Sequence, residues 1–410
     1  MREKVAVVGM GYVGLPLALT MTAAGKKVVG IDTDVSRVAE LSEGRSSISD
    51  VTGLALQEAI SDGLSFSTDY EPVASCSAVL ICVPTPLGRG NEQPDLQPVL
   101  KAVRMVASRI RNGALVVIES TVAPGTTGGC ILEEFTAAGK ILDEDFLLAF
   151  SPERVNPGGG GLRLEQIPKL TSGVSAASAE KCNLFYSSFI DTTVPVKGTR
   201  EAEFAKLLEN SYRLVNIALV NELAIAAFRM GIDYREVVNA ASSKPYGFEA
   251  FYPSAGAGGH CIPVDPVYLN SQIELETGKG SSVLALAIKN NHAMPEEILN
   301  IVRSLSGDLS GQQVLVAGIS YKPGVGDVRN SPGLTLMEKL RADGANVSFF
   351  DPLVEEITVK GSTLKSVSVA AKVRRFDLVI VLHSLEDALA DTLRLPGGKV
   401  LNVWNRFQAS

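Results

Sequence analysis

Residues 4–32 read KVAVVGMGYVGLPLALTMTAAGKKVVGID, and they carry the pattern of a parallel α/β unit. The run at 4–8 is short, apolar and rich in valine, which predicts a strand buried on both faces. A glycine-rich turn follows, and residues 15–24 then predict a helix that Gly25 ends. Residues 27–31 predict a second buried strand. A strand, a turn, a helix and a strand in this order indicate the α/β fold class.

The turn between the first strand and the helix reads GMGYVG at residues 9–14, and Asp32 follows the second strand. Gly9 permits a tight turn, Gly11 lets a pyrophosphate approach the backbone, and Gly14 lets the helix pack against the strand. The start of the helix supplies free N–H groups and a positive dipole. Asp32 would accept hydrogen bonds from the adenosine ribose and repel the extra phosphate of NADP. We therefore expect this unit to bind NAD; the alternative is a purely structural glycine turn.

The same segment is apolar enough to resemble a membrane or signal segment, since residues 5–24 contain almost no strongly polar side chain. Its glycines and Pro16 interrupt the run, however, and the glycines have the use just described. No later stretch approaches about 18 uninterrupted apolar residues. We expect a cytoplasmic protein that does not associate with a membrane.

The composition is that of an acidic globular protein of 410 residues, 46% hydrophobic and 20% charged. This length predicts about two to four domains. A formal net charge of −7 argues against nucleic acid as a partner. Five cysteines without a C-x-x-C spacing favour free thiols in a reducing compartment over disulfides or a zinc site. The three histidines are scattered, so we expect no metal.

The alternation of strands and helices continues, with strands predicted at 78–83, 114–118 and 146–150 and helices at 96–110 and from residue 126. In an open parallel sheet, ligands bind beyond the carboxyl ends of the strands. The residues at those ends are Pro84, Thr85, Ser120, Thr121, Glu153 and Arg154. Thr121 could hold a hydroxyl or a water, and Glu153 could act as a base. The alternative is that serine and threonine cap helices and that Glu153 and Arg154 form a solvated pair.

Residues 199–230 are the longest helical candidate, and a helix of about 30 residues would span about 45 Å. Its wide apolar coverage predicts either a spine between two domains or a dimer contact. Lys206 and Asn210 are one turn apart and share a face, which Arg213 adjoins. A lysine and an amide that face one way could stabilise an oxygen that becomes negative. The alternative is a polar stripe on a long helix.

Residues 256–266 read GAGGHCIPVDP, which is a poor helix and a poor strand and therefore predicts a shaped loop. Glycines of this kind let a ligand approach the backbone closely. Cys261 could be a buried filler, a metal ligand or a nucleophile, and the scattered histidines argue against a metal. As a nucleophile it needs cationic or dipolar help to form its thiolate. His260 adjoins it in sequence, but neighbours in an extended loop point opposite ways.

The last third repeats the alternation, with strands predicted at 313–319, 346–350, 377–382 and 399–403. We expect a second, smaller Rossmann-like unit, which lacks a G-x-G-x-x-G turn. Lys322 and Arg329 lie at its strand ends and suit a diphosphate; the alternative is a solvated loop. Before this unit, residues 284–305 predict a helix with a stop near Pro295.

With these sites in view, the chain resembles the UDP-glucose/GDP-mannose dehydrogenase family of nucleotide-sugar 6-dehydrogenases. The motifs are VAVVGMGYVGLPLA, VPTP, ESTVAPGT, SPERVNPG, EFAKLLENSYRLVNIALVNE, GAGGHCIPVDP and GISYKPGVGDVRNSP, and they span essentially the whole chain. The resemblance implies two Rossmann-like doubly wound domains joined by a long central helix, and a homodimer formed through that helix. It divides the chain into an NAD-binding domain at 1–195, a central helical domain at 196–300 and a nucleotide-sugar-binding domain at 301–410.

The resemblance further implies a four-electron oxidation of the C6 hydroxyl of a nucleotide-linked sugar to a carboxylate, with two NAD⁺. Cys261 would attack the C6 aldehyde and hold it as a thiohemiacetal and then as a thioester. Lys206 and Asn210 would stabilise the oxyanion. Asp265 and Thr121 would position the hydrolytic water, with Glu153 as the base. The residues implied for NAD are Gly9, Gly11, Tyr12, Val13, Gly14, Asp32, Arg37, Pro84, Thr85, Ser120, Thr121 and Arg329. Those implied for the nucleotide sugar are Glu153, Arg154, Lys206, Asn210, Arg213, Phe251, Tyr252, Ser254, Gly258 and Lys322.

The sequences GGHCIPVDP and PERVNPG are more similar to UDP-N-acetylhexosamine 6-dehydrogenases than to UDP-glucose enzymes, which usually read GGSCFPKD. This favours UDP-N-acetylglucosamine or UDP-N-acetylmannosamine as the substrate and a role in polysaccharide biosynthesis, with UDP-glucose or TDP-glucose as alternatives. Asn402 stands where relatives often carry aspartate. Two other classes stay open: a two-electron hydroxyacid-type dehydrogenase and a non-catalytic NAD-binding regulatory protein.

Overall fold

The computed structural model describes residues 3–46, 48, 51–88, 93–155, 162–367, 376–383, 399–403 and 408–409. The chain divides into two compact units, residues 1–209 and 210–410, and each unit is described by itself. The boundary lies within the long helix α7 (Thr199–Arg229), so this helix contributes to both units. The predicted division into three domains stays a prediction.

The first unit alternates strands and helices as the sequence predicts. Its described strands are β1 (Lys4–Val8), β2 (Lys27–Ile31), β3 (Ser65–Ser67), β4 (Ala78–Ile81), β5 (Ala114–Ile118), β6 (Phe146–Phe150), β7 (Lys169–Gly173) and β8 (Thr193–Pro195). Its described helices before α7 are α1 (Gly14–Ala23), α2 (Val35–Ser42), α3 (Gly53–Asp62), α4 (Gln97–Ala107), α5 (Leu132–Ala137) and α6 (Ala176–Ser187), with short turns η1 (Glu71–Ser75), η2 (Thr127–Ile131) and η3 (Leu164–Gln166).

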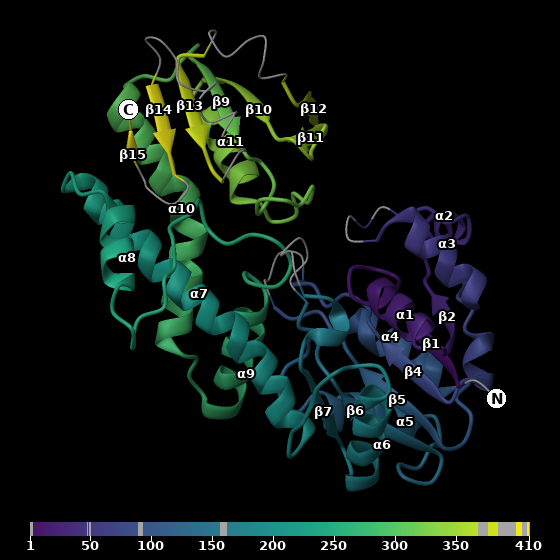
Figure 1. Cartoon of the computed structure of the whole chain (residues 1–410). Coiled ribbons are helices and arrows are strands. Elements are labelled where there is room, and N and C mark those ends of the chain that lie inside the picture. Colours follow the sequence, from purple (N-terminus) through teal and green to yellow (C-terminus); the bar gives the residue numbers. More distant parts are fainter. Residues whose placement is uncertain are drawn as a thin grey trace. The chain divides into compact units, whose positions relative to one another are not determined.

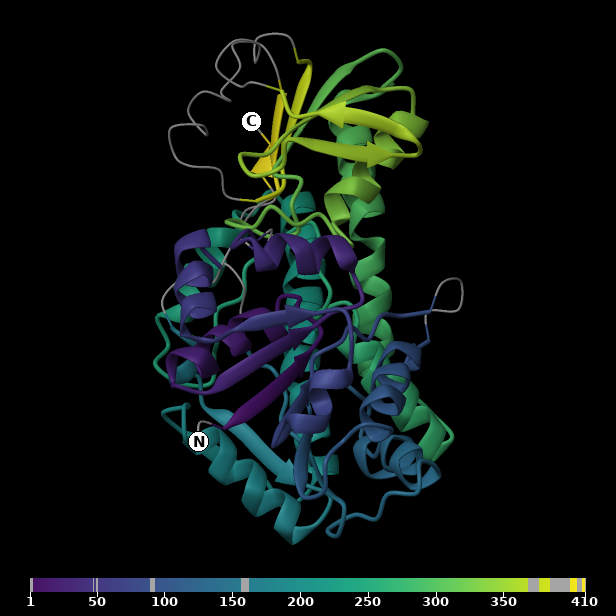
Figure 2. The same cartoon turned by 90° about the vertical axis from the view of Figure 1, so that its right-hand side faces the viewer.

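These strands form one sheet in the order β3-β2-β1-β4-β5-β6-β7-β8 (Figures 1 and 2). Neighbouring strands pair in parallel except β6 and β7, which are antiparallel. The strand order reverses at β1, which makes the sheet doubly wound and places a topological switch point beside the glycine turn. Because β7 is antiparallel to β6, the start of β7 returns to the carboxyl end of β6, where ligands bind in sheets of this kind.

Alternate residues of β1 face opposite layers of helices. Val5 and Val7 belong to a buried cluster with side chains of α1, α3 and α6, whereas Ala6 and Val8 belong to a cluster with side chains of α4 and α5. All four residues are at most 1% exposed. Burial of both faces explains why the strand has an uninterrupted apolar sequence. This packing fixes the carboxyl end of β1, at which the glycine turn begins.

Helix α7 is the one described helix that is long and apolar enough to cross a membrane by length and composition alone. A core helix of a globular protein passes the same test. Here Glu203, Lys206 and Asn221 are polar side chains buried within the protein. Leu214 and Ala218 belong to a buried apolar cluster with a side chain of α10. These contacts are typical of an internal helix.

The second unit combines helices with a smaller sheet. Its described helices after α7 are α8 (Tyr234–Ser242), α9 (Asp265–Thr277), α10 (Ser282–Ser306) and α11 (Pro332–Ala342). Its described strands are β9 (Gln313–Ala317), β10 (Asn346–Phe350), β11 (Glu356–Val359), β12 (Ser362–Lys365), β13 (Leu378–Val381), β14 (Lys399–Asn402) and β15 (Gln408–Ala409). The sheet order is β10-β9-β13-β14-β15, with only β15 antiparallel among these strands, and β11 and β12 form a separate hairpin. The predicted second, smaller Rossmann-like unit is confirmed.

The predicted stop near Pro295 is wrong, because α10 continues through this residue to Ser306. A proline inside a helix leaves the carbonyl four residues earlier without its partner, and that residue is Asn291. Met294 and Ile298 are nearly completely buried in the core of the second unit, so tertiary packing maintains the helix across the proline.

Candidate active site

The glycine turn between β1 and α1 has the geometry that a dinucleotide-binding turn requires. Gly9 has a φ of +96°, which favours glycine. A Cβ on Gly14 would lie 1.9 Å from the Gly9 carbonyl oxygen, so only glycine lets α1 start this close to β1. A Cβ on Gly11 would meet no atom within 4 Å, which leaves its backbone open to approach. The turn therefore fits the pyrophosphate of NAD.

Asp32 lies at the carboxyl end of β2 and is fixed to the same turn. Its Oδ2 accepts hydrogen bonds from the Met10 backbone N–H at 2.8 Å and from the Arg37 guanidinium at 3.1 Å. Its Oδ1 accepts one from the Asp34 N–H at 3.0 Å. The structure thus brings together the predicted glycine turn, the acid predicted to bind the ribose and Arg37.

The ends of β4 and β5 lie at one edge of the sheet because these strands are parallel neighbours. Ser120 is buried there, and its hydroxyl donates to the carbonyl oxygen of Val83 at 2.7 Å, with that of Ile81 at 3.2 Å. Its side chain therefore joins the two strand ends. Thr85 and Thr121 are half-buried at this edge, whereas Pro84 is exposed.

In the segment after β6, both predicted site residues, Glu153 and Arg154, form hydrogen bonds that hold the segment in place. Glu153 Oε1 accepts hydrogen bonds from the backbone N–H groups of Arg154 at 2.7 Å and Val155 at 2.5 Å. The Arg154 guanidinium pairs with Glu209 of α7 at 2.6 Å and donates to the Pro168 carbonyl at 2.8 Å. In this structure Arg154 pairs with the helix, while Glu153 caps its own loop.

Sequence reasoning missed Glu203, a fully buried carboxylate on α7. It accepts hydrogen bonds from the backbone N–H groups of Gly125 at 2.6 Å and Thr127 at 2.8 Å. Burial raises the pKa of Glu203 to about 7, although these hydrogen bonds act in the opposite direction. Glu203 joins the turn that follows Thr121 to the long helix. Its position among apolar residues of α7 was the signal available in the sequence.

Amide side chains from two helices hold the chain leading to Cys261. Asn291 of α10 is 4% exposed; its Oδ1 accepts from the Ala257 N–H at 2.7 Å, and its Nδ2 donates to the Ala257 carbonyl at 3.0 Å. Asn221 of α7 accepts from the Ser254 N–H at 2.8 Å. Neither asparagine was predicted as a site residue, although each determines the path of the loop.

The glycines before Cys261 pack against the segment after β9. A Cβ on Gly258 would lie 2.7 Å from the Asn330 carbonyl oxygen. A Cβ on Gly259, where φ is +81°, would lie 3.0 Å from the Tyr321 ring. The Gly259 N–H donates to the Arg329 carbonyl at 3.0 Å. At these two positions glycine lets the loop before Cys261 approach the segment after β9 closely.

Cys261 is half-buried, and its carbonyl accepts from the Val264 and Asp265 N–H groups at 3.1 and 2.8 Å in a turn that enters α9. Cys76 and Cys182 are buried, and burial raises the pKa of Cys76 to about 11 and that of Cys182 to about 12. They are therefore poor nucleophiles. Within the described residues, no group of three or more His, Cys, Asp or Glu side chains could hold a metal ion.

Two predicted catalytic residues of the second unit are in direct contact. Asn210 Nδ2 donates to Asp265 Oδ2 at 2.5 Å, and Asp265 is 2% exposed at the start of α9. Lys206 lies one turn earlier on α7, belongs to the first unit and is 9% exposed. Arg213 is exposed on the same helix.

Arg329, predicted to contact NAD, lies beside the residue that precedes Cys261, and three predicted substrate contacts lie elsewhere in the second unit. The Arg329 guanidinium pairs with Asp327 at 2.6 Å and lies 3.4 Å from Nδ1 of His260. Burial alone would raise the pKa of Asp327, but the hydrogen bonds from Arg329 hold it below its usual value. The ring of Phe251 is half-buried, and the exposed Tyr252 donates a hydrogen bond to Asn239 at 3.1 Å. Lys322 lies in the segment after β9, half-buried.

The strand ends of the second sheet carry a polar cluster. The Ser320 hydroxyl donates to Asp351 Oδ2 at 2.9 Å and contacts His383 Nε2 at 2.9 Å. Asn402 lies at the end of β14, and its Oδ1 is buried without a hydrogen-bond partner among the described residues. The neighbouring positions 404 and 405 lie outside the described residues.

A doubly wound sheet with an open glycine turn, followed by a second Rossmann-like sheet, defines a protein of the dinucleotide-binding class. Three parts of the chain match the UDP-glucose/GDP-mannose dehydrogenase family. Residues 3–190 match its NAD binding domain, residues 200–293 its central domain and residues 315–392 its UDP binding domain. The chain belongs to the UDP-glucose/GDP-mannose dehydrogenase family. It is an NAD-dependent oxidoreductase that acts on nucleotide sugars.

Similar proteins agree on this class and differ in the sugar they are named for. The chain is 38% identical over 361 residues to a UDP-N-acetyl-D-glucosamine 6-dehydrogenase of Pseudomonas aeruginosa, covering 86% of this chain and 83% of the relative. It is 34% identical to a UDP-N-acetyl-D-mannosamine dehydrogenase of Pyrococcus horikoshii, covering 86% and 84%. A UDP-glucose dehydrogenase structure from Pyrobaculum islandicum matches with a TM-score of 0.88 at 28% identity, covering 98% and 94%.

Proposed function

We propose that this protein oxidises C6 of a UDP-N-acetylhexosamine to the carboxylate in a four-electron reaction, with UDP-N-acetylglucosamine as the first candidate and UDP-N-acetylmannosamine as the second. The observation that carries the reaction is the Cys261 loop, in which Cys261 is only partly buried while amides from α7 and α10 fix the chain before it. The relatives at 38% and 34% identity, named for these two sugars, support the choice of substrate. UDP-glucose and TDP-glucose are the alternatives.

The proposed chemistry balances with one water and two cofactors. NAD, when bound, accepts a hydride in each of two oxidations. In the first oxidation, C6 loses a hydride and its hydroxyl loses a proton, which gives the C6 aldehyde. The Cys261 thiolate adds to the C6 aldehyde, and the new oxyanion takes a proton to give a thiohemiacetal. Loss of a hydride from C6 and a proton from the hydroxyl gives the thioester. Water then attacks the thioester, the carbon–sulfur bond breaks, and the carboxylate leaves with the Cys261 thiolate restored.

The roles of the other residues are proposals from the family motifs, with support from their chemistry. Lys206 and Asn210 would donate to the oxyanion, because an ammonium and an amide stabilise developing negative charge. Asp265 accepts a hydrogen bond from Asn210, which holds that amide in a fixed orientation. Thr121 and Asp265 would orient the water, and Glu153 would accept its proton.

The cofactor and substrate contacts are proposed from the same motifs. Gly11 supports the placement of the pyrophosphate because its backbone is open, and Asp32 supports that of the ribose because it is anchored to the turn. The remaining NAD contacts proposed are Gly9, Tyr12, Val13, Gly14, Arg37, Pro84, Thr85, Ser120, Thr121 and Arg329. The substrate contacts proposed are Glu153, Arg154, Lys206, Asn210, Arg213, Phe251, Tyr252, Ser254, Gly258 and Lys322.

We also propose a cytoplasmic homodimer formed through α7. The helix exposes large apolar side chains at helical spacing, namely Phe204, Leu208, Tyr212, Leu219 and Leu223. Exposed apolar side chains in a row are typical of a protein contact. Leu219→Glu should convert the dimer to a monomer in light scattering, whereas an unchanged mass would exclude this face.

The experiment that tests the substrate compares NADH production from UDP-N-acetylglucosamine, UDP-N-acetylmannosamine, UDP-glucose and TDP-glucose. We expect the highest kcat/KM with an N-acetylhexosamine. Cys261→Ser should abolish turnover and keep NAD binding, and Cys130→Ser, which alters another half-buried thiol, is the matched control. A higher kcat/KM with UDP-glucose would overturn the proposed choice of sugar substrate. Normal turnover in Cys261→Ser would overturn the proposed mechanism.

A further inference from the structure

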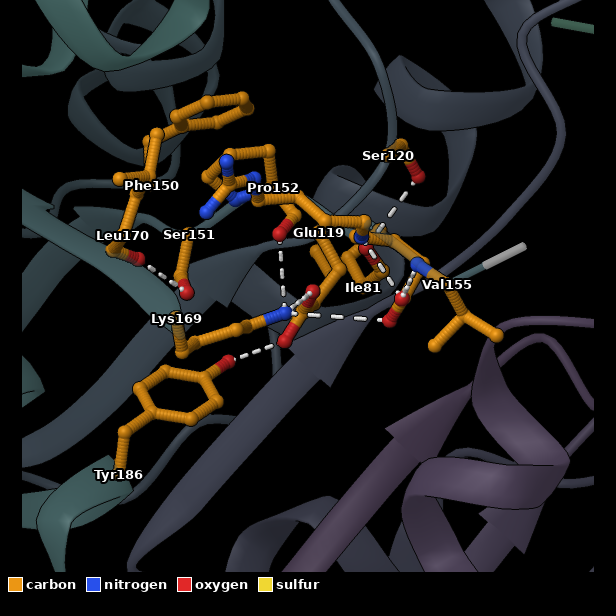
Figure 3. A network of polar contacts seen from close by, with 12 residues as sticks. Ile81, Glu119, Ser120, Phe150, Ser151, Pro152, Val155, Lys169, Leu170 and Tyr186 are labelled. Atoms are coloured by element: carbon orange, nitrogen blue, oxygen red, sulfur yellow. Dashed lines mark hydrogen bonds and ion pairs between the residues drawn. The ribbon is translucent and has the colours of Figure 1, made fainter. Parts of the chain in front are cut away.

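A buried ion pair lies directly behind Glu153 in the first unit. Lys169 Nζ donates to Glu119 Oε2 at 2.5 Å and to the Pro152 carbonyl at 3.0 Å, and it lies 3.9 Å from Glu153 Oε2. Tyr186 donates its hydroxyl to the other oxygen of Glu119. Figure 3 shows Lys169 between Glu119, Tyr186 and Pro152.

The sheet topology explains why these residues meet. Glu119 follows β5, and Lys169 begins β7, which runs antiparallel to β6. Phe150 pairs with Ser172, so continuing this register beyond β6 brings Glu153 opposite Lys169. The lysine is therefore placed by the strand pairing at the edge where Glu153 leaves the sheet.

The buried ion pair costs stability that an apolar pair of similar volume would not cost. Glu119 is 1% exposed and Lys169 is 5% exposed. Removing two charges from water is expensive, and apolar residues of similar volume often replace such a pair without loss of stability. Packing alone therefore does not explain this pair, and the pair adjoins the loop that carries Glu153.

Three titratable groups of the described residues interact with Glu153. They are Lys169 from β7, Glu119 from the end of β5 and the Cys82 thiol after β4. Burial alone would lower the pKa of Lys169, but the Glu119 and Glu153 carboxylates raise it, so the ammonium keeps its proton. Burial raises the pKa of Cys82 well above its usual value, so this thiol carries no charge. Lys169 is thus the one cation facing Glu153 in this set.

We propose that Lys169 is a positioning residue for Glu153: held by Glu119 and Tyr186, its ammonium fixes the Pro152 carbonyl and supports the Glu153 carboxylate, whose Oε2 lies 3.9 Å away. This inference rests on the proposed role of Glu153 as the base that accepts a proton from water. Lys169 itself does not touch the reacting atoms; it acts through the loop and through its charge.

The test is kcat at saturating nucleotide sugar and NAD, compared with KM for the nucleotide sugar. The Lys169→Met/Glu119→Gln double variant removes both charges together and leaves no unpaired buried ion. We expect its kcat to fall by about 10-fold or more while KM stays within about 2-fold, because the Glu153 loop loses its support and a displacement of about 1 Å can cost about 100-fold in rate. Ser172→Ala is the matched control, since it removes a buried hydrogen bond of 2.7 Å from β7 to the Phe150 carbonyl and leaves the lysine charge intact. Its kcat and KM should match those of the wild type.

Glu153→Gln separates the failure of this inference from the failure of the proposed function. If Glu153→Gln kept the wild-type kcat, Glu153 would not be the base. If it lost turnover while the double variant kept the wild-type kcat, the positioning role of Lys169 alone would be wrong. A double variant that cannot fold by circular dichroism would also overturn the inference, because the pair would then serve the fold.

Discussion

Replacing Asn291 with alanine should loosen the loop that carries Cys261 without changing any residue of that loop. Asn291→Ala removes both hydrogen bonds to Ala257, at 2.7 and 3.0 Å. The Ala257 N–H and carbonyl then lose their partner, and a buried polar group left unpaired costs about 1–3 kcal/mol. We expect the free energy of unfolding to fall by about 2–4 kcal/mol.

The same change should lower activity more than stability alone explains. Displacement of a nucleophile by about 1 Å can cost about 100-fold in rate. We therefore expect kcat of Asn291→Ala to fall by about 10-fold or more under conditions where the protein is folded. Urea denaturation gives the free energy, and steady-state NADH production at saturating substrates gives kcat.

Asn290 provides the control on the same helix. Its side chain donates to Glu222 at 2.7 Å in an exposed pair, so Asn290→Ala should change the free energy of unfolding by less than about 1 kcal/mol. Its kcat should stay within about 2-fold of the wild type. If Asn291→Ala behaved like Asn290→Ala in both measurements, the hydrogen bonds from Asn291 would not position the loop.

Other changes test the NAD turn and the long helix. Gly14→Ala should unfold the turn, because its Cβ would lie 1.9 Å from a carbonyl oxygen, whereas Gly11→Ala should keep the melting temperature and weaken NAD binding in calorimetry. Equal loss of stability in both would contradict this. Burial raises the pKa of Glu203 to about 7 from 4.5, so its stabilising contribution is complete below pH 4.5 and is lost as the pH rises through 7, on the order of 3 kcal/mol. Urea denaturation from pH 4 to 8 should show this loss in the wild type but not in Glu203→Gln; parallel curves would refute it.

The fold was predictable where burial dictates the sequence. Strands β1, β2, β5 and β6 were predicted to the residue, because a strand covered on both faces is continuously apolar. Strand β10 was also predicted to the residue, although Phe349 is its only buried residue. Strand β7 was not predicted, because its buried side chains include Lys169, Thr171 and Ser172. Their polarity is compensated by contacts from other elements, such as the hydrogen bond from Ser172 to the Phe150 carbonyl.

The site was predictable only where a motif is local. The glycine turn and the Cys261 loop are short stretches whose chemistry can be inferred from neighbouring residues. Glu203, Asn291 and Lys169 were missed because their partners are far along the chain. Glu203 binds a backbone group 76 residues away, Asn291 one that is 34 away, and Lys169 a carboxylate that is 50 away. Their importance follows from the fold, which pairs them.

The ratio of NADH formed to nucleotide sugar consumed tests the four-electron mechanism most directly. With limiting UDP-N-acetylglucosamine and excess NAD, absorbance gives the NADH and mass spectrometry identifies the product. We predict two NADH for each sugar and a uronate product, because the thioester on Cys261 must form by the second oxidation before water releases it. One NADH for each sugar, with an aldehyde as the product, would contradict the proposed mechanism.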